Sequence, residues 1–202
     1  MTLAIPQRLR WALLYRLGRT PWDTGLTPPE LTAEIQLHQP GRFLDIGCGT
    51  GTNCVHLAQK GWHCVGLDWN AQALRTGRHR AEGLEVTFVR ADVTRLSELD
   101  LGDRFDLAMD LGCFHSIAGE RRSAYIQGLL RQLSSRAAFL LYARFATLSG
   151  QRRFGLDKQQ VIDLFSPYFE LDWVEDGKEV PCSSAWYRWE RRADVPPGAV
   201  GL

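Results

Sequence analysis

From Arg42 onward, the chain alternates short apolar runs with longer segments whose apolar positions recur at helical spacing. The short runs are rich in β-branched and aromatic residues, as buried strands are. The expected strands are 43–46, 64–67, 86–89, 105–109 and 138–142, and the expected helices are 52–60, 71–82, 120–133 and 157–165, with a short turn at 96–99. This alternation predicts an α/β fold with a doubly wound, parallel sheet.

Two more strand-like runs, 169–175 and 184–190, follow the last of these helices. They are close in sequence, and Asp176 and Gly177 form a turn signal after the first run. We expect them to pair as an antiparallel hairpin. The whole sheet is then seven-stranded, mostly parallel and Rossmann-like, with the hairpin at its end.

Two helical segments, 5–17 and 28–39, are expected before the first strand, with Thr27 able to cap the second and Pro28 and Pro29 suited to its first turn. Arginines interrupt the apolar residues of the first segment, which indicates an amphipathic helix rather than a signal peptide or a membrane span. We therefore expect one domain over 1–202, with an N-terminal helical lid (1–40), a core (41–192) and a flexible tail (193–202).

Composition narrows the classes of partner. The 202 residues are 45% hydrophobic, enough for one core, and the formal net charge is only +1, so neither nucleic acid nor a membrane is an expected partner. Five cysteines without a CxxC pair indicate a reducing compartment, and the cytoplasm is the expected location. Cys54, His56, His63 and Cys64 fit no usual zinc spacing, so no metal site is expected.

The strongest motif is F-L-D-I-G-C-G-T-G, residues 43–51, in which a strand leads into three alternating glycines and then a helix. Gly47, Gly49 and Gly51 allow a sharp turn and bring backbone N–H groups and the helix terminus against a ligand. A dinucleotide fingerprint needs glycine or alanine at the position that Thr52 occupies. The loop is therefore GxGxG rather than GxGxxG.

Acidic residues end the next two expected strands. Asp68 follows the glycine loop by about 20 residues, where a carboxylate can accept both hydrogens of a ribose diol, an arrangement that also suits NAD. Trp69 lies beside it and is either a cofactor contact or a core or surface tryptophan. Asp92 lies in V-R-A-D-V, residues 89–93, at the end of the next strand. It is either a ligand-binding carboxylate or a helix N-cap.

The fourth strand ends in D-L-G-C-F-H, residues 110–115, and the carboxyl ends of parallel strands border the ligand crevice of an open sheet. Asp110, Cys113 and His115 are therefore the candidate catalytic residues. His115 is the best candidate base, with a structural histidine as the alternative. Cys113 either packs as a small apolar residue or acts as a nucleophile.

The D-I-G-C-G-T-G stretch resembles motif I of class I methyltransferases that use S-adenosylmethionine (SAM), and the closing hairpin is also typical of them. The resemblance implies that Gly47, Gly49 and Gly51 contact SAM, with Asp45 ordering the loop or the methionine amino group. It also implies ribose binding by Asp68, adenine binding by Asp92 and the Val93 backbone, and S-adenosylhomocysteine as product. Asp110 is expected at the methionine amino group or at a polar substrate.

The segment T-P-W-D-T-G-L-T-P-P-E-L, residues 20–31, is similar to the P-W-D-x-G-x-P-x-P segment ahead of motif I in the thiopurine and tellurite-resistance methyltransferase group. There it helps to cover the cofactor, so Trp22 is expected near the sulfonium, or else as an anchor of the N-terminal helix. The group often methylates thiols and other soft nucleophiles, and Arg144, Arg152 and Arg153 offer charge for an anionic acceptor. A small-molecule methyl acceptor is therefore expected, whereas the oligomeric state is not indicated by the sequence.

Two other functions fit parts of the pattern. A non-catalytic SAM-binding protein would keep the same cofactor residues, because binding and chemistry use separable groups. An NAD-dependent oxidoreductase is disfavoured by Thr52 and by the long segment before the glycine loop.

Overall fold

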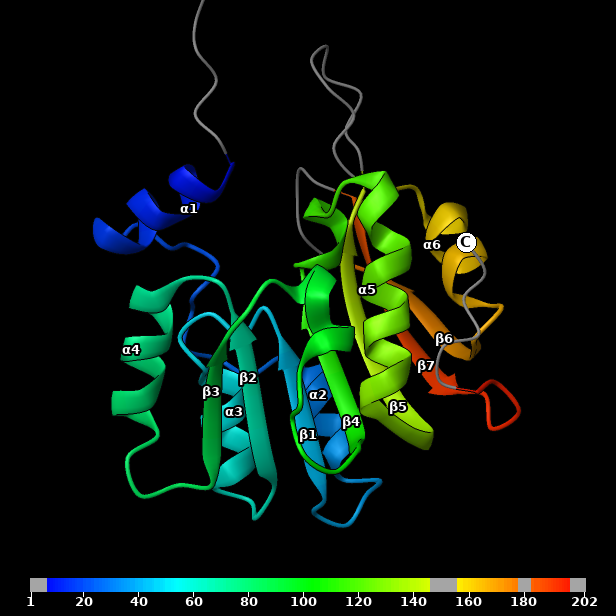
Figure 1. The fold of residues 1–202 in the computed structure, drawn as a ribbon, viewed down its shortest axis with the longest axis horizontal. Helices are drawn as coiled ribbons and strands as arrows, with labels where there is room; N and C mark the ends of the chain where they lie inside the picture. Colours follow the sequence, from blue (N-terminus) through cyan, green and yellow to red (C-terminus); the bar gives the residue numbers. More distant parts are fainter. Residues whose placement is uncertain (1–6, 146–155, 178–182, 197–202) are drawn as a thin grey trace, which may run out of the picture.

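The computed structural model describes residues 7–145, 156–177 and 183–196, and it contains one seven-stranded sheet in the order β3-β2-β1-β4-β5-β7-β6 (Figure 1). The strands are β1 (Arg42–Ile46), β2 (His63–Asp68), β3 (Val86–Arg90), β4 (Phe105–Leu111), β5 (Leu133–Arg144), β6 (Phe169–Asp176) and β7 (Ser184–Arg191). β1 to β5 pair in parallel, whereas β7 is antiparallel to both β5 and β6. The predicted sheet and its closing hairpin are confirmed.

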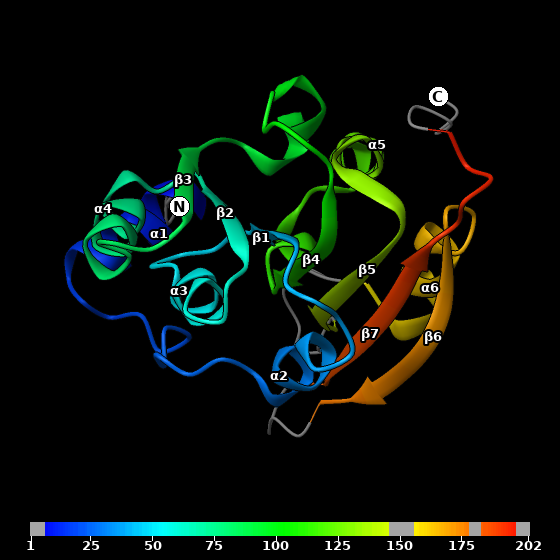
Figure 2. The ribbon, with the colours of Figure 1, turned by 90° about the horizontal axis from the view of Figure 1, so that it is seen from below.

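Helices cover both faces of the sheet (Figure 2). They are α1 (Gln7–Arg16), α2 (Pro29–Ile35), α3 (Thr52–Ala58), α4 (Ala71–Arg80), α5 (Gly119–Gln132) and α6 (Lys158–Phe165), with short three-ten helices η1 (Val93–Glu98) and η2 (Phe114–Ser116). On one face, residues of α5, α6 and η1 pack against apolar strand residues, and on the other face α2, α3 and α4 do so. Because both faces are buried, the central strands are almost continuously apolar rather than alternating.

The second predicted helix is shorter than expected. It runs over Pro29–Ile35 rather than 28–39, and its N-cap is Pro28, which makes no side-chain cap hydrogen bond, so Thr27 is not the cap. The helix stops once Leu31, Glu34 and Ile35 are buried, since the residues after it are exposed or half-buried. The apolar pattern identified the element but not its last turn.

Strand β5 begins earlier than predicted. It starts at Leu133 rather than at residue 138, and its pairing with β4 shifts register between Phe105 and Leu107. Arg136 has a φ of 62°, in the left-handed region that non-glycine residues seldom adopt. The first residues of β5 therefore pass through a β-bulge before regular pairing with β4 resumes at Leu107 and Ala138.

The N-terminal helix α1 is not amphipathic in the expected sense. Trp11 and Tyr15 face the protein, but Leu9, Leu13 and Leu17, spaced four residues apart, are about half exposed or more. Apolar side chains thus occupy two opposite sides of this helix. Residues 5 and 6 of the predicted helix, Arg152 and Arg153 of the expected acceptor region, and residues 197–202 of the expected tail lie outside the described residues.

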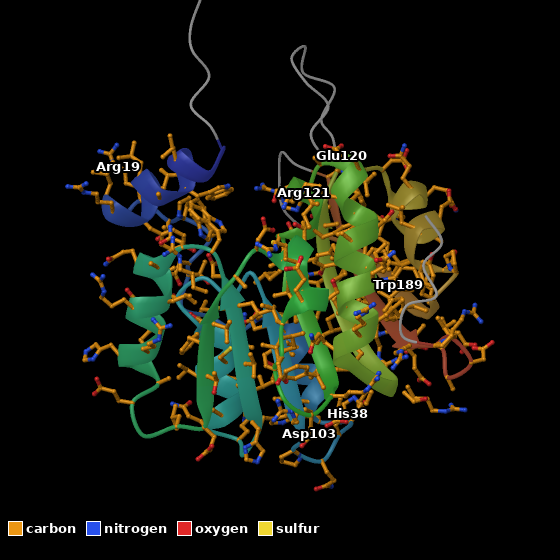
Figure 3. All side chains as sticks on the ribbon, in the orientation of Figure 1. Arg19, His38, Asp103, Glu120, Arg121 and Trp189 are labelled. Atoms are coloured by element: carbon orange, nitrogen blue, oxygen red, sulfur yellow. The ribbon has the colours of Figure 1, made fainter. Side chains whose placement is uncertain are left out.

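The strands β1 to β5 all end on the side of the sheet where α1 lies, and this side is the upper edge in Figure 1. Figure 3 shows Arg121 at the start of α5 on the same side, whereas His38 and Asp103 lie at the opposite end. No helix in the described part of the chain is long and apolar enough to cross a membrane.

Candidate cofactor and acceptor site

The glycine loop between β1 and α3 is shaped by backbone conformations that side chains disfavour. Gly47, Gly49 and Gly51 have φ values of 77°, 55° and 77°. A Cβ at Gly47 would lie 2.8 Å from Cβ of Cys113, and one at Gly51 would lie 2.4 Å from the ring of Phe88. The first and third glycines are therefore required by the packing of the loop on its neighbours, whereas the second faces the N-terminal segment.

Asp68, at the end of β2, is joined to this loop directly. Its Oδ2 accepts a hydrogen bond of 3.0 Å from Gly49 N, and its Oδ1 accepts one of 2.7 Å from Asn70 N. The carboxylate is buried, and burial raises its pKa despite these donors. Asp68, which is predicted to bind the ribose, therefore lies beside the glycine loop, which is predicted to bind the amino-acid part of SAM.

Asp45, on β1, lies beneath the loop and is buried. Asn53 and the Cys54 thiol donate to it, and Cys54 Sγ lies 3.7 Å from Oδ2. Burial, with smaller contributions from the Asp110 and Asp68 charges, raises its pKa to about 7. Because this pKa is close to neutral pH, a nearby cation would shift the carboxyl group to its ionised form.

Asp92 has two sets of partners. Its Oδ1 accepts from Thr94 N at 3.0 Å, so it is the N-cap of η1, as one of the two sequence interpretations held. Its Oδ2 lies 2.6 Å from the Arg121 guanidinium, which reaches over from α5 (Figure 3). Val93 starts η1 with its side chain in the core. Contact of Asp92 and Val93 with adenine stays a prediction.

Asp110 is fully buried at the end of β4. Its carboxylate accepts from Cys113 N at 2.6 Å, from Phe114 N at about 3.0 Å and from Tyr125 Oη at 2.8 Å. It therefore holds the turn that follows β4 in place. Burial raises the pKa of Asp110 to about 6 and raises that of the Cys113 thiol, which stays protonated at neutral pH.

His115 lies on η2, in the turn after β4. Its Nδ1 lies 3.5 Å from Arg144 N, which donates to it, and the C–H edge of its ring lies near Gly112. Burial, and then the Arg144 charge, lowers the pKa of His115 to about 4. The imidazole is therefore neutral near pH 7.

Four residues of the N-terminal segment contact the glycine loop or one another. A Cβ at Gly49 would lie 2.8 Å from the Tyr15 hydroxyl. Trp22 Nε1 donates to that hydroxyl at 3.3 Å, and the Trp22 ring packs edge-on against Trp11 at 4.5 Å. Asp23 accepts from Thr50 Oγ1 at 2.8 Å. Trp22 thus has the contacts of an anchor, and its proximity to the sulfonium remains a prediction.

Tyr15, Thr50 and Arg80 were not identified from the sequence. Arg80, at the end of α4, donates to Thr50 Oγ1 and pairs with Asp23 at 3.7 Å. The motif around the glycines gives no signal for Tyr15 or Arg80, because both are far away in the chain. A weak signal was present in the spacing of Trp11 and Tyr15, which places two aromatic rings on one side of a helix.

The residues present fit SAM. A hollow of about 460 Å³ lies between α1 and the end of β2, lined among others by Ala12, Arg16, Trp69 and Arg90. Beside it, Asn70 Nδ2 is buried and has no hydrogen-bond partner among the described residues. The glycine loop, the buried carboxylates at the ends of β1, β2 and β4, and this hollow lie at the same end of the sheet, and the carboxylates suit a cationic ligand. In the described part of the chain, no three His, Cys, Asp or Glu residues form a possible metal site.

Sequence comparison agrees with this geometry. Residues 43–136 match the methyltransferase domain family. A 2-heptyl-1-hydroxyquinolin-4(1H)-one methyltransferase of Mycobacteroides abscessus is 33% identical over 128 residues, which are 61% of this chain and 56% of that protein. An uncharacterized methyltransferase of Schizosaccharomyces pombe is 30% identical over 130 residues, 60% of this chain and 87% of that protein.

Solved structures share the fold. One, from work on the conversion of a disulfide bond into a thioacetal group during echinomycin biosynthesis, has a TM-score of 0.76 and 25% identity and covers 93% of both chains. TehB from Haemophilus influenzae has a TM-score of 0.70 at 14% identity, covering 90% of this chain and 67% of its own. The latter likeness concerns the fold alone.

The sheet order, the GxGxG loop and the carboxylates at the strand ends define a Rossmann-like methyltransferase fold. The chain belongs to the class I SAM-dependent methyltransferases. The predicted family and cofactor are confirmed, and the NAD-dependent oxidoreductase alternative is wrong. The chain spans just over half the length of the M. abscessus relative, so acceptor and partners are treated below as proposals.

Proposed function

We propose that this protein transfers the methyl group of SAM to a small molecule whose nucleophile is soft or already ionised, such as a thiolate or an acidic N-hydroxy or phenolic oxygen. The observation that carries the proposal is the state of the turn after β4, which Asp110 holds in place, which carries His115, and whose Cys113 packs against Gly47 of the cofactor loop. None of the three has the contacts expected of a general base.

His115 is a poor base for this position. Thiols and phenols ionise at pKa values of about 8 to 10, so a proton would move uphill by about four units or more to an imidazole of pKa about 4. Its Nδ1 already accepts from Arg144 N, which leaves the neutral ring with its proton on Nε2. We assign to His115 the lining of the acceptor side of the site.

Asp110 acts through the turn. Its carboxylate accepts two backbone N–H groups and the Tyr125 hydroxyl, and so it fixes Cys113 against Gly47. The Cys113 thiol is protonated and its backbone is held, so it contributes shape. Bound SAM supplies an electrophilic methyl group on a sulfonium, and the residues around it need only align the acceptor and exclude water.

The relatives support a small acceptor. The M. abscessus protein is named for an N-hydroxyquinolone, and the structural neighbour for chemistry at a disulfide. The near-neutral net charge of +1 gives no general attraction to nucleic acid, which is not proposed as a substrate. A location in the cytoplasm remains a prediction from the cysteine pattern.

The test is a screen of SAM consumption with thiols, acidic phenols, N-hydroxy heterocycles and primary amines, followed by rate profiles between pH 5.5 and 9. The rate should rise with pH at an inflection that follows the pKa of each acceptor. An inflection at one pH for every acceptor, or a preference for amines, would contradict the ionised-acceptor proposal. SAM binding without consumption under any condition would favour the non-catalytic SAM-binding alternative.

A further inference from the structure

We propose that Tyr15 is a cofactor-binding residue whose hydroxyl donates a hydrogen bond to the carboxylate of the amino-acid part of SAM, and that Trp22, Asp23 and Thr50 position it. This inference rests on the proposed function only in that both require SAM. It adds a ligand contact from α1 that none of the sequence motifs contains.

The first support is where the hydroxyl lies. Oη of Tyr15 lies 2.8 Å from the position that a Cβ on Gly49 would occupy. The hydroxyl therefore packs directly against the middle glycine of the loop. The other two glycines face Cys113 and Phe88, whose side chains pack in the hydrophobic clusters on the two faces of the sheet. Gly49 is thus the point at which the loop meets α1, and the group that meets it is a hydroxyl.

The second support is hydrogen-bond direction. The Tyr15 oxygen accepts from Trp22 Nε1, an indole group that can only donate. The hydroxyl proton must therefore point elsewhere, and no acceptor for it is recorded among the described residues. Burial, and the nearby charges of Asp68 and Asp23, raise the pKa of Tyr15, so the proton stays on the oxygen at every working pH.

The third support is a set of contacts that holds the segment after α1 on the same loop. Thr50 Oγ1 lies 2.8 Å from both oxygens of Asp23, and Arg80 bonds Thr50 and pairs with Asp23. Asp23 is the residue after Trp22, so this cluster fixes the indole that orients the Tyr15 hydroxyl. We call Asp23, Thr50 and Arg80 the latch.

The chemistry of the ligand selects the carboxylate. By its resemblance to motif I, the loop wraps the amino-acid end of SAM, and the carboxylate is the anion at that end. The buried carboxylates of Asp45 and Asp68 suit the cationic parts and the ribose, but they cannot donate a proton to an anion when ionised. Tyr15 offers a neutral donor at Gly49 of the same loop.

The experiment measures dissociation constants by calorimetry for SAM, S-adenosylhomocysteine and 5′-methylthioadenosine, which lacks the amino-acid part. Tyr15→Phe keeps the ring packing and removes only the hydroxyl. It should weaken SAM and S-adenosylhomocysteine about threefold to tenfold and leave 5′-methylthioadenosine unchanged. Tyr168→Phe, on the far side between α6 and β6, is the matched control and should change none of the three.

The latch is tested separately as a positioning device. Thr50→Val should weaken SAM binding, and Thr50→Ser, which keeps the hydroxyl, should restore it. Because the latch acts through Tyr15, the double variant with Tyr15→Phe should bind no more weakly than the weaker single variant. Additive losses would overturn the positioning role.

Unchanged SAM affinity in a folded Tyr15→Phe protein, or equal losses for all three ligands, would overturn the carboxylate contact while leaving the proposed function intact. Failure of the unaltered protein to bind SAM would instead remove the proposed function itself. The melting temperature of each variant identifies a loss that comes only from misfolding.

Discussion

The backbone amide of Gly49 donates a hydrogen bond of 3.0 Å to Oδ2 of Asp68, which joins the glycine loop to the end of β2. One carboxylate therefore supports the loop and is also the predicted ribose ligand. Its other oxygen accepts from Asn70 N, which begins the approach to α4. The loop and the predicted ribose ligand form one hydrogen-bonded unit, so a change at Asp68 should affect both.

Asp68→Ala is expected to weaken SAM binding by at least about tenfold, because it removes a ligand group and leaves the Gly49 and Asn70 N–H groups without acceptors. Asp68→Asn keeps one oxygen acceptor and should lose less. Calorimetric titration with SAM measures both. Equal affinities for the unaltered protein and the Ala variant would exclude Asp68 from the cofactor site.

Gly51→Ala tests whether the third glycine is required by packing. The new Cβ would lie 2.4 Å from the Phe88 ring at a φ of 77°, so strain and a steric clash add. We expect the free energy of unfolding to fall by about 2–4 kcal/mol in urea denaturation. Gly83→Ala is the matched control, since its φ is 80° and nothing lies within 4 Å of its Cβ. That control should lose only about 1 kcal/mol, and similar losses in both variants would show that Phe88 yields easily.

Much of this fold could be predicted from the sequence because its signals are local. The alternation of apolar runs and helical segments identified every strand, and Gly47 to Gly51 identified the cofactor loop. The end of α2 and the start of β5 could not be predicted, because the first depends on which residues are buried against the protein and the second on which residues pair with β4. Leu133, for example, joins β5 only because it pairs with Phe105 ahead of a bulge.

The parts of the site that sequence reasoning missed are long-range. Tyr15 lies over Gly49, and Arg80 bonds Thr50, but no spacing rule links α1 or the end of α4 to the loop. Arg121 and Asp92 are paired for the same reason, through the fold rather than the sequence. Residue type indicated which groups could do chemistry, whereas their orientation required the structure.

Asp45→Asn should change how stability depends on pH. Burial raises the folded-state pKa of Asp45 to about 7, above the usual value of 3.8 for an aspartate. The protonated form is favoured in the folded protein, so its contribution to stability is present below pH 4 and is lost as the pH rises toward 7. The Asn variant cannot ionise. Its free energy of unfolding relative to the unaltered protein should therefore increase between pH 4.5 and 7.5 in urea denaturation, and a constant difference would show that Asp45 titrates normally.

His115→Gln tests whether the histidine is a base. A general base contributes about 10²- to 10⁴-fold to the rate, so its loss would lower kcat by that amount. Burial and the Arg144 charge lower the pKa of His115 to about 4, so the imidazole is a weak base. We therefore expect kcat to fall by less than tenfold. The pH–rate inflection should also stay at the pKa of the acceptor in both proteins. Single-turnover rates at saturating SAM, measured from pH 5.5 to 9, separate the two roles. A hundredfold loss with an inflection that disappears in the variant would restore His115 as the base and require an acceptor that arrives protonated.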